Sequence, residues 1–504
     1  MREDILKTKL EKLKNIREFG MDPYPEKAER DFKIHEALEK FSELGEKEIH
    51  LVGRVRSMRP MGGSCFSHIE DESGKIQLFL NKNNIPESAQ NSSNNEAGRD
   101  KYKLFVKNIE SGDFVEVLGK LFETKAGEKT LEVHDWKVLS KNIRPIPTEH
   151  FGIKDEEELL RKRYLDLMLN TEARELFRKK NIFWQTIRSF LVGRGFLEVQ
   201  TPVMEHIPGG AEAEPFITHH NALDQDFFLR ISLELPLKRL LVGGYEKVFE
   251  MGRIFRNEGM DKGHLQEFDN MEFYQAYLDF NGGIQMIEEM FKEIVQKVTG
   301  GMKTVYEGQE IDWEGSPAQN KSGSGGWTRV DYFEAFKKET SLDLAEDLSV
   351  ETLCAKANEL GIKYEKEYGL GRMIDTIYKK TVRPKLIQPC FLVGHPLVVS
   401  PLSKRDPENP KKVLRVQPVA GGAELGNGFS ELNDPVDQRA RFQEQMKLRE
   451  SGDKEAQMFD EDFVEALEYG LPPAFGFGMG ERFFAFLMDK PVRETTIFPL
   501  VKKK

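Results

Sequence analysis

One short segment constrains this chain more than any other: an apolar run over residues 248–254 that ends in the tetrad Phe255-Arg256-Asn257-Glu258. The run predicts a β-strand, in which side chains alternate between the two faces. Glu250, Arg256 and Glu258 would then lie on one face. A charged Arg/Glu pair where a strand meets a loop suits a phosphate chain better than a packed core. A surface ion pair at a strand end is the competing interpretation of the tetrad taken alone.

A second strand is predicted after the tetrad, and its polar residues share one face. Residues 259–266 would form the loop of a hairpin, which would place Arg256 and Glu258 beside Glu272 and Tyr274. Two segments alternate with period two: Phe268, Asn270, Glu272 and Tyr274 in the first, and Asn427, Phe429 and Glu431 in the second. Because buried carboxylates are costly unless they are paired, these faces predict a pocket for a cationic ligand. An exposed sheet face is the alternative.

The length of 504 residues predicts more than one domain, because single cores stop growing at roughly 250–300 residues. A formal net charge of −11 argues against a protein that coats nucleic acid, although local patches can still bind RNA. The three cysteines (Cys65, Cys354 and Cys390) fit neither a disulfide framework nor a zinc site. No stretch reaches the ~18–20 apolar residues of a membrane span, and the charged first residues are unlike a secretory signal. We therefore expect a cytoplasmic protein that does not bind membranes.

The N-terminal part of the chain predicts a helix followed by a small barrel. Residues 1–19 form an amphipathic pattern that Gly20 stops. Five short β patterns occupy residues 49–139, with glycines at the turns. This arrangement is typical of the five-stranded oligonucleotide-binding barrel. The segment 81–99, rich in Asn and Ser, predicts a surface loop.

A proline-containing linker at residues 144–147 separates the barrel from the rest of the chain. Beyond it, a helical pattern runs to Gly193, and residues 197–203 then alternate as a strand that contains Pro202. The predicted organisation is a domain at residues 1–145, a domain at residues 146–504, a loop insertion at 313–327 and a helical excursion at 340–385.

The order of three motifs resembles the class II aminoacyl-tRNA synthetases. These motifs are the helix and strand ending near Pro202, the Phe-Arg-Asn-Glu tetrad with its loop and strand, and the glycine-rich segment that ends in Arg482. Within that class the chain is similar to the lysyl-tRNA synthetases of the bacterial type over almost its whole length. The segments that carry this resemblance are residues 209–211, 215–224, 233–235, 237–240, 426–427, 431–434 and 471–473.

The resemblance implies a fold and a reaction. The fold would be α+β, with an N-terminal five-stranded oligonucleotide-binding barrel and a class II catalytic domain, an antiparallel sheet flanked by helices. The reaction would activate L-lysine with ATP to lysyl-adenylate and pyrophosphate, and would then transfer lysine to the 3′ adenosine of tRNA(Lys). It also implies Mg²⁺ on the phosphates, a homodimer built through motif one, and no DNA partner.

The same resemblance implies residue roles. The lysine-binding positions would be Gly210, Glu234 and Glu272 at the α-amino end, Tyr274 and Glu431 at the ε-ammonium end, and Asn427 and Phe429 on the wall. The ATP-binding positions would be Arg256, Glu258, His264, Phe268, Glu424 and Arg482, with the two arginines as the catalytic residues. The metal ligands would be Glu424, Glu431 and, as a doubtful third, Gln417. The positions that contact the anticodon would be Arg59, Phe66 and Gln77, although by pattern alone Phe66 suits the barrel core equally well.

The chain departs from the family pattern in several places. Gln417 stands where the family usually has a glutamate, and a neutral amide binds a divalent cation more weakly than a carboxylate does. Glu214 replaces a common arginine, and the sequence does not determine which glycine of the segment 476–480 lines the lysine pocket. In the loop after the tetrad, where Lys262 could substitute, three residues replace the usual Arg, Asn and Pro: Gly263, Leu265 and Gln266.

Three other functions fit parts of the pattern. A synthetase of the aspartyl or asparaginyl type shares the architecture, but an acidic amino acid would need cations where Glu234, Glu272 and Glu431 stand. A ligase that attaches a lysine-like group to a protein would not need an anticodon-binding barrel. A non-catalytic RNA-binding protein with the same fold would not need Arg256 and Arg482.

Overall fold

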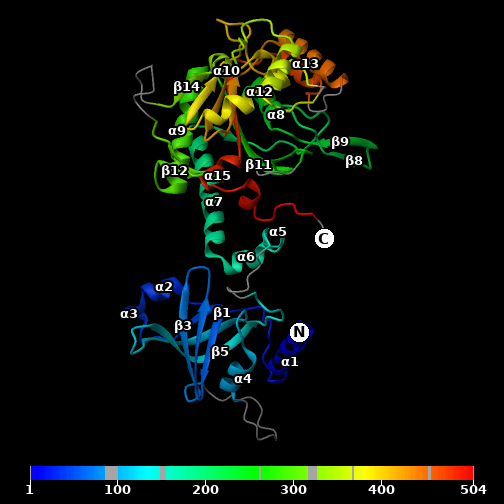
Figure 1. Cartoon of the computed structure of the whole chain (residues 1–504). Coiled ribbons are helices and arrows are strands. Elements are labelled where there is room, and N and C mark those ends of the chain that lie inside the picture. The colour runs from blue at the N-terminus through cyan, green and yellow to red at the C-terminus, as the bar shows by residue number, and fades with distance from the viewer. Residues whose placement is uncertain are drawn as a thin grey trace. The chain divides into compact units, whose positions relative to one another are not determined.

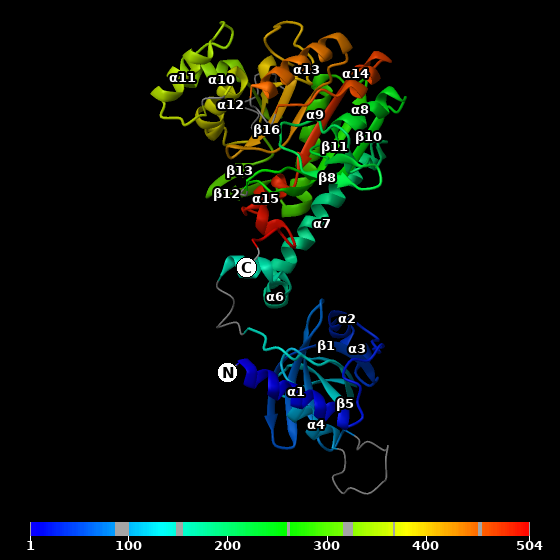
Figure 2. The same cartoon turned by 90° about the vertical axis from the view of Figure 1, so that its right-hand side faces the viewer.

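The chain folds into two compact units, Met1–Glu156 and Glu157–Lys504, shown in Figures 1 and 2. The structure is a computed structural model. It describes residues 2–85, 100–147, 155–259, 263–315, 326–365, 368–451 and 456–502. The division between the two units falls after residue 156. Within the described ranges, no helix is long and apolar enough to cross a membrane.

The first unit is a closed five-stranded barrel with short helices. Its helices are α1 (Arg2–Glu18), α2 (Ile34–Glu39), α3 (Phe41–Leu44) and α4 (Lys101–Asn108). Its strands are β1 (Ile49–Met61), β2 (Ser64–Glu70), β3 (Lys75–Asn81), β4 (Phe114–Glu123) and β5 (Lys129–Ser140). The barrel closes in the order β1-β2-β3-β5-β4, which confirms the predicted fold. Most of the predicted loop at 81–99 lies outside the described residues.

Strand alternation decides which side chains fill the barrel. On β2, Cys65, Ser67 and Ile69 point inward and are buried. Phe66 lies between them on the outer face and is only partly buried, so the barrel-core alternative for Phe66 is wrong.

The second unit is built on a nine-stranded sheet. The sheet contains β6 (Leu197–Glu198), β10 (Lys247–Phe255), β11 (Glu267–Ala276), β14 (Thr328–Asp331), β15 (Cys390–Val393), β16 (Arg415–Ala420), β17 (Ala423–Glu424), β18 (Asn427–Ser430) and β19 (Ala474–Gly480). The strand order is β14-β15-β16-β18-β19-β11-β10-β6, and β17 pairs with β16. The interior pairs are antiparallel, as predicted, whereas the two outermost pairs, β14–β15 and β10–β6, are parallel.

Helices and two small sheets surround this sheet. The helices are α5 (Glu156–Arg161), α6 (Arg163–Leu169), α7 (Thr171–Val192), α8 (Glu234–Val242), α9 (Phe280–Thr299), α10 (Tyr332–Thr340), α11 (Val350–Glu359), α12 (Leu370–Thr381), α13 (Pro435–Glu450), α14 (Glu461–Glu468) and α15 (Arg482–Leu487). The short strands are β7 (Met204–Glu205), β8 (Ile217–His220) and β9 (Gln225–Leu229) in one sheet, and β12 (Lys303–Tyr306) and β13 (Gln309–Asp312) in the other. Figure 2 shows α10, α11 and α12 grouped at the sheet edge, where the helical excursion was predicted.

Helix α7 shows how the sequence sets an element and its packing. The Asn170 side chain caps its start by accepting hydrogen bonds from two backbone N–H groups. Apolar residues at helical spacing, including Phe183, Ile187 and Phe190, are buried against α9 and the sheet. Gly193 follows its last residue and Gly195 adopts a φ of +81°, so the helix ends where the glycines predicted.

The predicted strand at 197–203 is wrong beyond its first two residues, because only Leu197 and Glu198 pair with β10. Pro202 has no N–H to donate, and the N–H of Thr201 donates to the Glu250 carboxylate at 3.0 Å in place of a neighbouring strand. The chain therefore leaves the sheet early and enters the small sheet at β7.

Two tryptophans hold the ends of the predicted loop insertion. The side-chain N–H of Trp327 donates to the carbonyl of Trp313 at 3.0 Å, and both indoles are buried in the main core. The residues 316–325 between them lie outside the described ranges. The insertion thus begins and ends at a fixed point of the core.

Candidate active site

A trough crosses the sheet because a glycine-bearing strand lies between two strands with large side chains. Strand β19 pairs with β11 on one side and with β18 on the other. Gly476, Gly478 and Gly480 are the cross-strand partners of Tyr274, Glu272 and Asn270, respectively. The alternate residues of β11 and β19, such as Phe273 and Phe477, point to the opposite face and into the main core. One face of the same strands is therefore apolar core and the other is a polar pocket.

Gly476 and Gly478 form the floor of this trough, at two different places along it. A β-carbon on Gly476 would overlap the Tyr274 ring and the Glu431 carboxylate. A β-carbon on Gly478 would lie 3.1 Å from the Cγ atom of Glu272. Gly476 is therefore the glycine beneath the Glu431 end of the pocket, which the sequence alone did not determine.

Glu272 is held in place by four hydrogen bonds and is buried. One of its oxygens accepts from the Ser232 hydroxyl at 2.8 Å, the Leu233 N–H at 2.9 Å and the Asn270 amide at 2.9 Å. The other oxygen accepts from the Tyr274 hydroxyl at 2.8 Å. These four hydrogen bonds fix the orientation of the Glu272 side chain.

Lys238 is the main feature next to the pocket that the sequence reasoning missed. Neither Lys238 nor its partner Glu431 is among the residues that line the pocket. Lys238 lies on α8, is 1% exposed, and its ammonium forms ion pairs with both Glu234 and Glu431. The aromatic rings of Phe429, Tyr274 and Phe463 surround the ammonium with centroids at 5.1, 5.9 and 5.8 Å. The spacing Glu234–Lys238 is i, i+4 on a helix and could have suggested the first pair, but only the fold brings in Glu431.

Burial and shared charge shift the protonation of this cluster. Burial raises the pKa of Glu234 to about 7 and places the pKa of Glu431 well above its usual range, while the Lys238 ammonium opposes both shifts. Burial disfavours the charge on Lys238, but the two carboxylates outweigh it and raise the lysine pKa. The cluster therefore keeps its ammonium and, near neutral pH, holds a proton on one carboxyl.

A glycine with a left-handed backbone closes this end of the pocket. Gly210 has a φ of +84°, and a β-carbon there would lie 2.8 Å from both the Ser232 hydroxyl and the Glu234 Cβ. Only glycine fits that conformation and approach.

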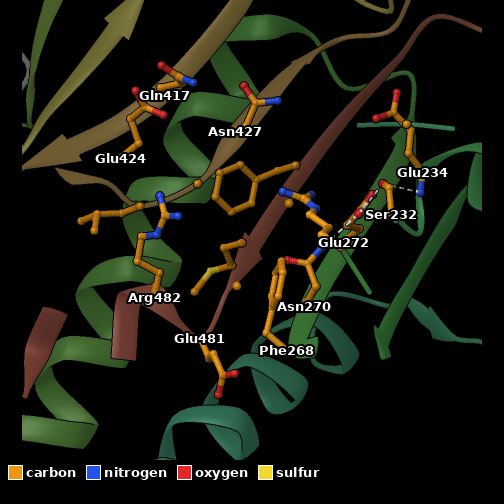
Figure 3. A pocket seen from close by; sticks show the side chains of 18 of the residues that line it. Ser232, Glu234, Phe268, Asn270, Glu272, Gln417, Glu424, Asn427, Glu481 and Arg482 are labelled. Atoms are coloured by element: carbon orange, nitrogen blue, oxygen red, sulfur yellow. Dashed lines mark hydrogen bonds between the residues drawn. The ribbon is translucent and has the colours of Figure 1, made fainter. Parts of the chain in front are cut away.

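Figure 3 shows Glu234 and Glu272 at one end of the pocket and Arg482, Glu424 and Gln417 at the other, with Glu481 near Arg482. The Arg482 guanidinium donates to the Gly263 carbonyl at 3.1 and 3.3 Å. Arg256 also lines the pocket, where it donates to the Ile231 carbonyl and has its guanidinium 5.3 Å from the Phe268 ring centroid. Glu258 and His264 also line the pocket. Lys262, proposed as a substitute in the loop, lies outside the described residues.

Glu424 and Gln417 are the candidate metal ligands at this second end, and each already has a protein partner. A Glu424 oxygen accepts from Arg383 at 3.3 Å, and the Gln417 carbonyl oxygen lies 3.0 Å from the His395 Nε2 atom. Burial lowers the pKa of His395 to about 3, with the nearby Arg415 acting in the same direction. Glu431 lies at the other end, against the ammonium of Lys238.

Glu250 was predicted to share the face of Arg256 and Glu258, and its surroundings differ from theirs. It is 2% exposed, does not line the pocket, and pairs with Arg230 at 2.6 Å. Its second oxygen accepts from the Thr201 hydroxyl. Glu250 therefore fixes the chain next to Pro202, at the end of motif one, and has no open side toward a ligand.

The outer face of the barrel carries an aromatic group next to polar side chains. Phe66 is the cross-strand partner of Arg59 and of Phe79, whose ring centroid lies 5.0 Å from that of Phe66. The Gln77 amide donates to Glu128 at 2.7 Å and accepts from the Thr130 hydroxyl at 2.8 Å. Partly exposed rings beside hydrogen-bonding groups suit single-stranded bases.

Comparison with known proteins identifies the family. The family model described as tRNA synthetases class II (D, K and N) matches residues 155–502, and an OB-fold nucleic acid binding domain matches residues 49–139. The lysine–tRNA ligase of Carboxydothermus hydrogenoformans is 41% identical over 99% of this chain and 98% of its own length. Those of Thermotoga maritima and Moorella thermoacetica are 41% and 42% identical over 100% and 99% of this chain, and over 97% and 98% of their own lengths. The chain belongs to the lysine–tRNA ligase family.

Family membership and pocket chemistry agree on the amino acid. The class II model covers the aspartate, lysine and asparagine types alike and does not distinguish them. The full-length relatives are lysine–tRNA ligases. The pocket chemistry agrees with them, because three buried acids around one internal lysine favour a cationic ligand: Glu234, Glu272 and Glu431. The aspartyl and asparaginyl alternatives are thereby set aside.

Proposed function

We propose that the chain activates L-lysine with ATP and transfers it to tRNA(Lys), with the residue roles set out below. A lysine carboxylate oxygen attacks the α-phosphorus of ATP, the bond from that phosphorus to the oxygen of the β-phosphate breaks, and pyrophosphate leaves. The terminal adenosine of the tRNA then attacks the lysyl carbonyl and releases AMP. The observation that carries this proposal is the trough itself, which has acids at one end and two arginines toward the other.

The two ammonium groups of lysine are assigned to the acidic end. Glu431 is 1% exposed, and one of its oxygens pairs with the Lys238 ammonium, whereas the other, Oε1, has no hydrogen-bond partner among the described residues. A buried carboxylate oxygen without a hydrogen bond is costly, and Glu431 Oε1 lies above Gly476 in this state. The ε-ammonium of the lysine substrate would donate to this oxygen. Glu234, Glu272 and the Gly210 backbone are left for the α-amino group, while Asn427 and Phe429 form the wall.

The pocket charges balance a bound lysine. Three carboxylates and the Lys238 ammonium sum to −2 when all are ionised, and the two ammonium groups of lysine carry +2. The lysine carboxylate is then left for Arg256, next to the α-phosphate. Lys238 thus reduces the charge of the three acids to −2, which equals in size the charge of the two ammonium groups of lysine. This balance favours lysine over an uncharged isostere.

ATP is assigned to the end that holds Phe268 and Arg482. Arg256 contacts the α-phosphate and the attacking carboxylate, and Arg482 contacts the base or the γ-phosphate. Glu258, His264 and Phe268 lie on the adenine side. No side-chain nucleophile is needed, because positioning and neutralisation of phosphate charge supply the catalysis.

The residues at this end fit one magnesium ion. Mg²⁺ in such sites commonly takes one or two carboxylates and completes its shell with phosphate oxygens and water, and Glu424 supplies one carboxylate. When bound, the ion neutralises charge on the phosphates. Glu431 is not kept as a ligand, because Lys238 occupies its protein side.

The barrel is assigned to the anticodon of tRNA(Lys). Phe66 would stack on a base, and Arg59 and Gln77 would form polar contacts beside it. Because Gln77 is bonded to Glu128 and Thr130, it would have to exchange a partner to bind a base. DNA is not an expected partner.

A homodimer and a cytoplasmic location complete the proposal. Exposed apolar side chains gather around β6 to β9, where motif one would form the subunit interface: Leu197, Val203, Met204, Ile217, Leu223 and Tyr245. Burial of such side chains against a second copy removes apolar surface from water. A molar mass measured by light scattering tests this, and a monomer contradicts it.

Two assays test the reaction. ATP–pyrophosphate exchange should depend on L-lysine, and the purified protein should attach radiolabelled lysine to tRNA(Lys). Exchange without lysine, or faster exchange with aspartate, would overturn the amino acid assignment. Exchange without tRNA charging would favour a protein or other acceptor.

A further inference from the structure

A buried ion pair joins helix α7 to the end of strand β19, next to Arg482. The Lys180 ammonium, on α7, pairs with the Glu481 carboxylate, and the two side chains are 14% and 3% exposed. Glu481 follows Gly480, the last residue of β19, and precedes Arg482, the first residue of α15. Glu481 borders the pocket, but Figure 3 shows its side chain and that of Arg482 pointing in opposite directions. The ion pair therefore holds the junction from the side away from the Arg482 guanidinium.

The same ammonium also holds a second segment at this end of the pocket. It donates to the carbonyl of Thr495, a fully buried residue, at 2.9 Å. Thr495 ends the short helical turn Val492–Thr495. Val492 lines the pocket and packs with Leu265 and Ala485. A lysine ammonium has three N–H donors, and here they join α7 to two segments that border the Arg482 end.

The pocket face of β19 carries no side chain that could fix this junction, because it has glycine at positions 476, 478 and 480. Glycine leaves the backbone freer than any other residue does. The ladder between β11 and β19 ends at the pair Asn270–Gly480, and the Glu481 N–H then donates to the Asp269 carbonyl at 3.2 Å. The direction in which Arg482 leaves the sheet is therefore set just after Gly480, by the groups that hold Glu481.

We infer that Lys180 is a positioning residue for Arg482, because its ion pair with Glu481 sets the place and direction of that guanidinium. The inference rests on the proposed function in one respect, that ATP occupies the Arg482 end. Lys180 is not among the described residues that line the pocket, so it acts through Glu481 and not on a substrate. Its loss should weaken ATP binding and spare lysine, because Glu234 and Glu272 lie at the other end.

The first experiment measures pyrophosphate exchange in the full-length protein. Lys180→Met removes the charge and should raise the KM for ATP about tenfold while changing the KM for lysine less than about twofold, because a small misplacement of a binding group is costly. Lys180→Arg keeps the cation and should restore most of the loss. Lys179→Met, one position earlier on α7, is the matched control and should change neither KM. An unchanged KM for ATP in Lys180→Met, or equal rises in both KM values, would contradict the inference.

A double-mutant cycle tests the route through Glu481 and does not depend on the stability of one variant. Glu481→Gln removes the charge of the other partner and should also raise the KM for ATP. Because the two residues act as one pair, Lys180→Met combined with Glu481→Gln should raise it no further than the larger single effect. Effects that multiply in the double variant would show that Lys180 does not act through Glu481.

Titration calorimetry with ATP alone separates this inference from the proposed function. If the wild type binds ATP but shows no lysine-dependent exchange, the proposed function fails, and a larger Kd for ATP in Lys180→Met still supports the role of Lys180. If the wild type shows lysine-dependent exchange and Lys180→Met binds ATP as tightly as the wild type does, the role of Lys180 is refuted and the proposed function stands.

Discussion

Binding of lysine should release a proton from the Glu234–Glu431 pair. The two carboxyls share the Lys238 ammonium, and burial raises the pKa of Glu234 to about 7. The charged groups facing Glu234 are Lys238, Glu272 and Arg415, together with Glu431 itself. An incoming ammonium stabilises the ionised carboxylate, so the carboxyl loses its proton when lysine binds.

The direction and the size of the pH dependence of lysine binding follow from the pKa of Glu234. With one carboxyl at about 7, about 90% of molecules carry the proton at pH 6 and about 25% at pH 7.5. Because the protonated form must lose its proton before it can pair with the ligand, affinity falls as the pH falls. The Kd for lysine should be about eightfold larger at pH 6 than at pH 7.5.

Isothermal titration calorimetry provides the measurement. Lysine is titrated without ATP in two buffers of different ionisation enthalpy, and the difference gives the number of protons released. We expect about 0.9 at pH 6 and about 0.25 at pH 7.5. Glu234→Gln should bind lysine more weakly and with a smaller pH dependence. Equal affinity at both pH values, with no proton released by the wild type, would refute the account of the cluster.

Three further predictions concern single side chains. Gly476→Ala should raise the KM for lysine at least tenfold and leave ATP binding unchanged, because the added methyl overlaps Tyr274 and Glu431; pyrophosphate exchange measures both, and an unchanged lysine KM would remove Gly476 from the pocket floor. Lys238→Met should lower the free energy of unfolding by about 3–5 kcal/mol, since it leaves buried acids uncompensated, and saturating lysine should recover part of the loss in a thermal melt. Phe66→Ala should raise the KM for tRNA about tenfold through lost stacking, with exchange unaffected; an equal effect on exchange would contradict a role in RNA binding alone.

Period-two patterns predicted most of the sheet and the polar face of the pocket. The hairpin of β10 and β11 forms as predicted, and the barrel closes from the five predicted strands. The predicted register is wrong, because Glu250 and Val248, and not Arg256 and Glu258, lie opposite Glu272 and Tyr274. The hairpin and the barrel both rest on local alternation, which the chain shows directly. The strand at 197–203 failed because alternation does not show whether a partner strand is present, and a carboxylate took up the Thr201 N–H.

The side-chain contacts around the pocket were harder to predict from the sequence. Lys238 stands in a helix among leucines, where a surface lysine is the ordinary interpretation. Its burial depends on Glu431, which lies far away in the sequence and reaches it only through the sheet. The His395–Gln417 contact has the same origin, since it joins β16 to a loop after β15. Such contacts between distant segments leave no local pattern.

The bond between Trp313 and Trp327 has a practical consequence. Both indoles are buried in the core, and the Trp327 side chain donates to the backbone carbonyl of Trp313. The two ends of the insertion are therefore held next to each other. Its length can then change without moving the strands on either side. A fluorescent reporter or affinity tag spliced into that stretch should leave the enzyme folded and its melting temperature unaltered.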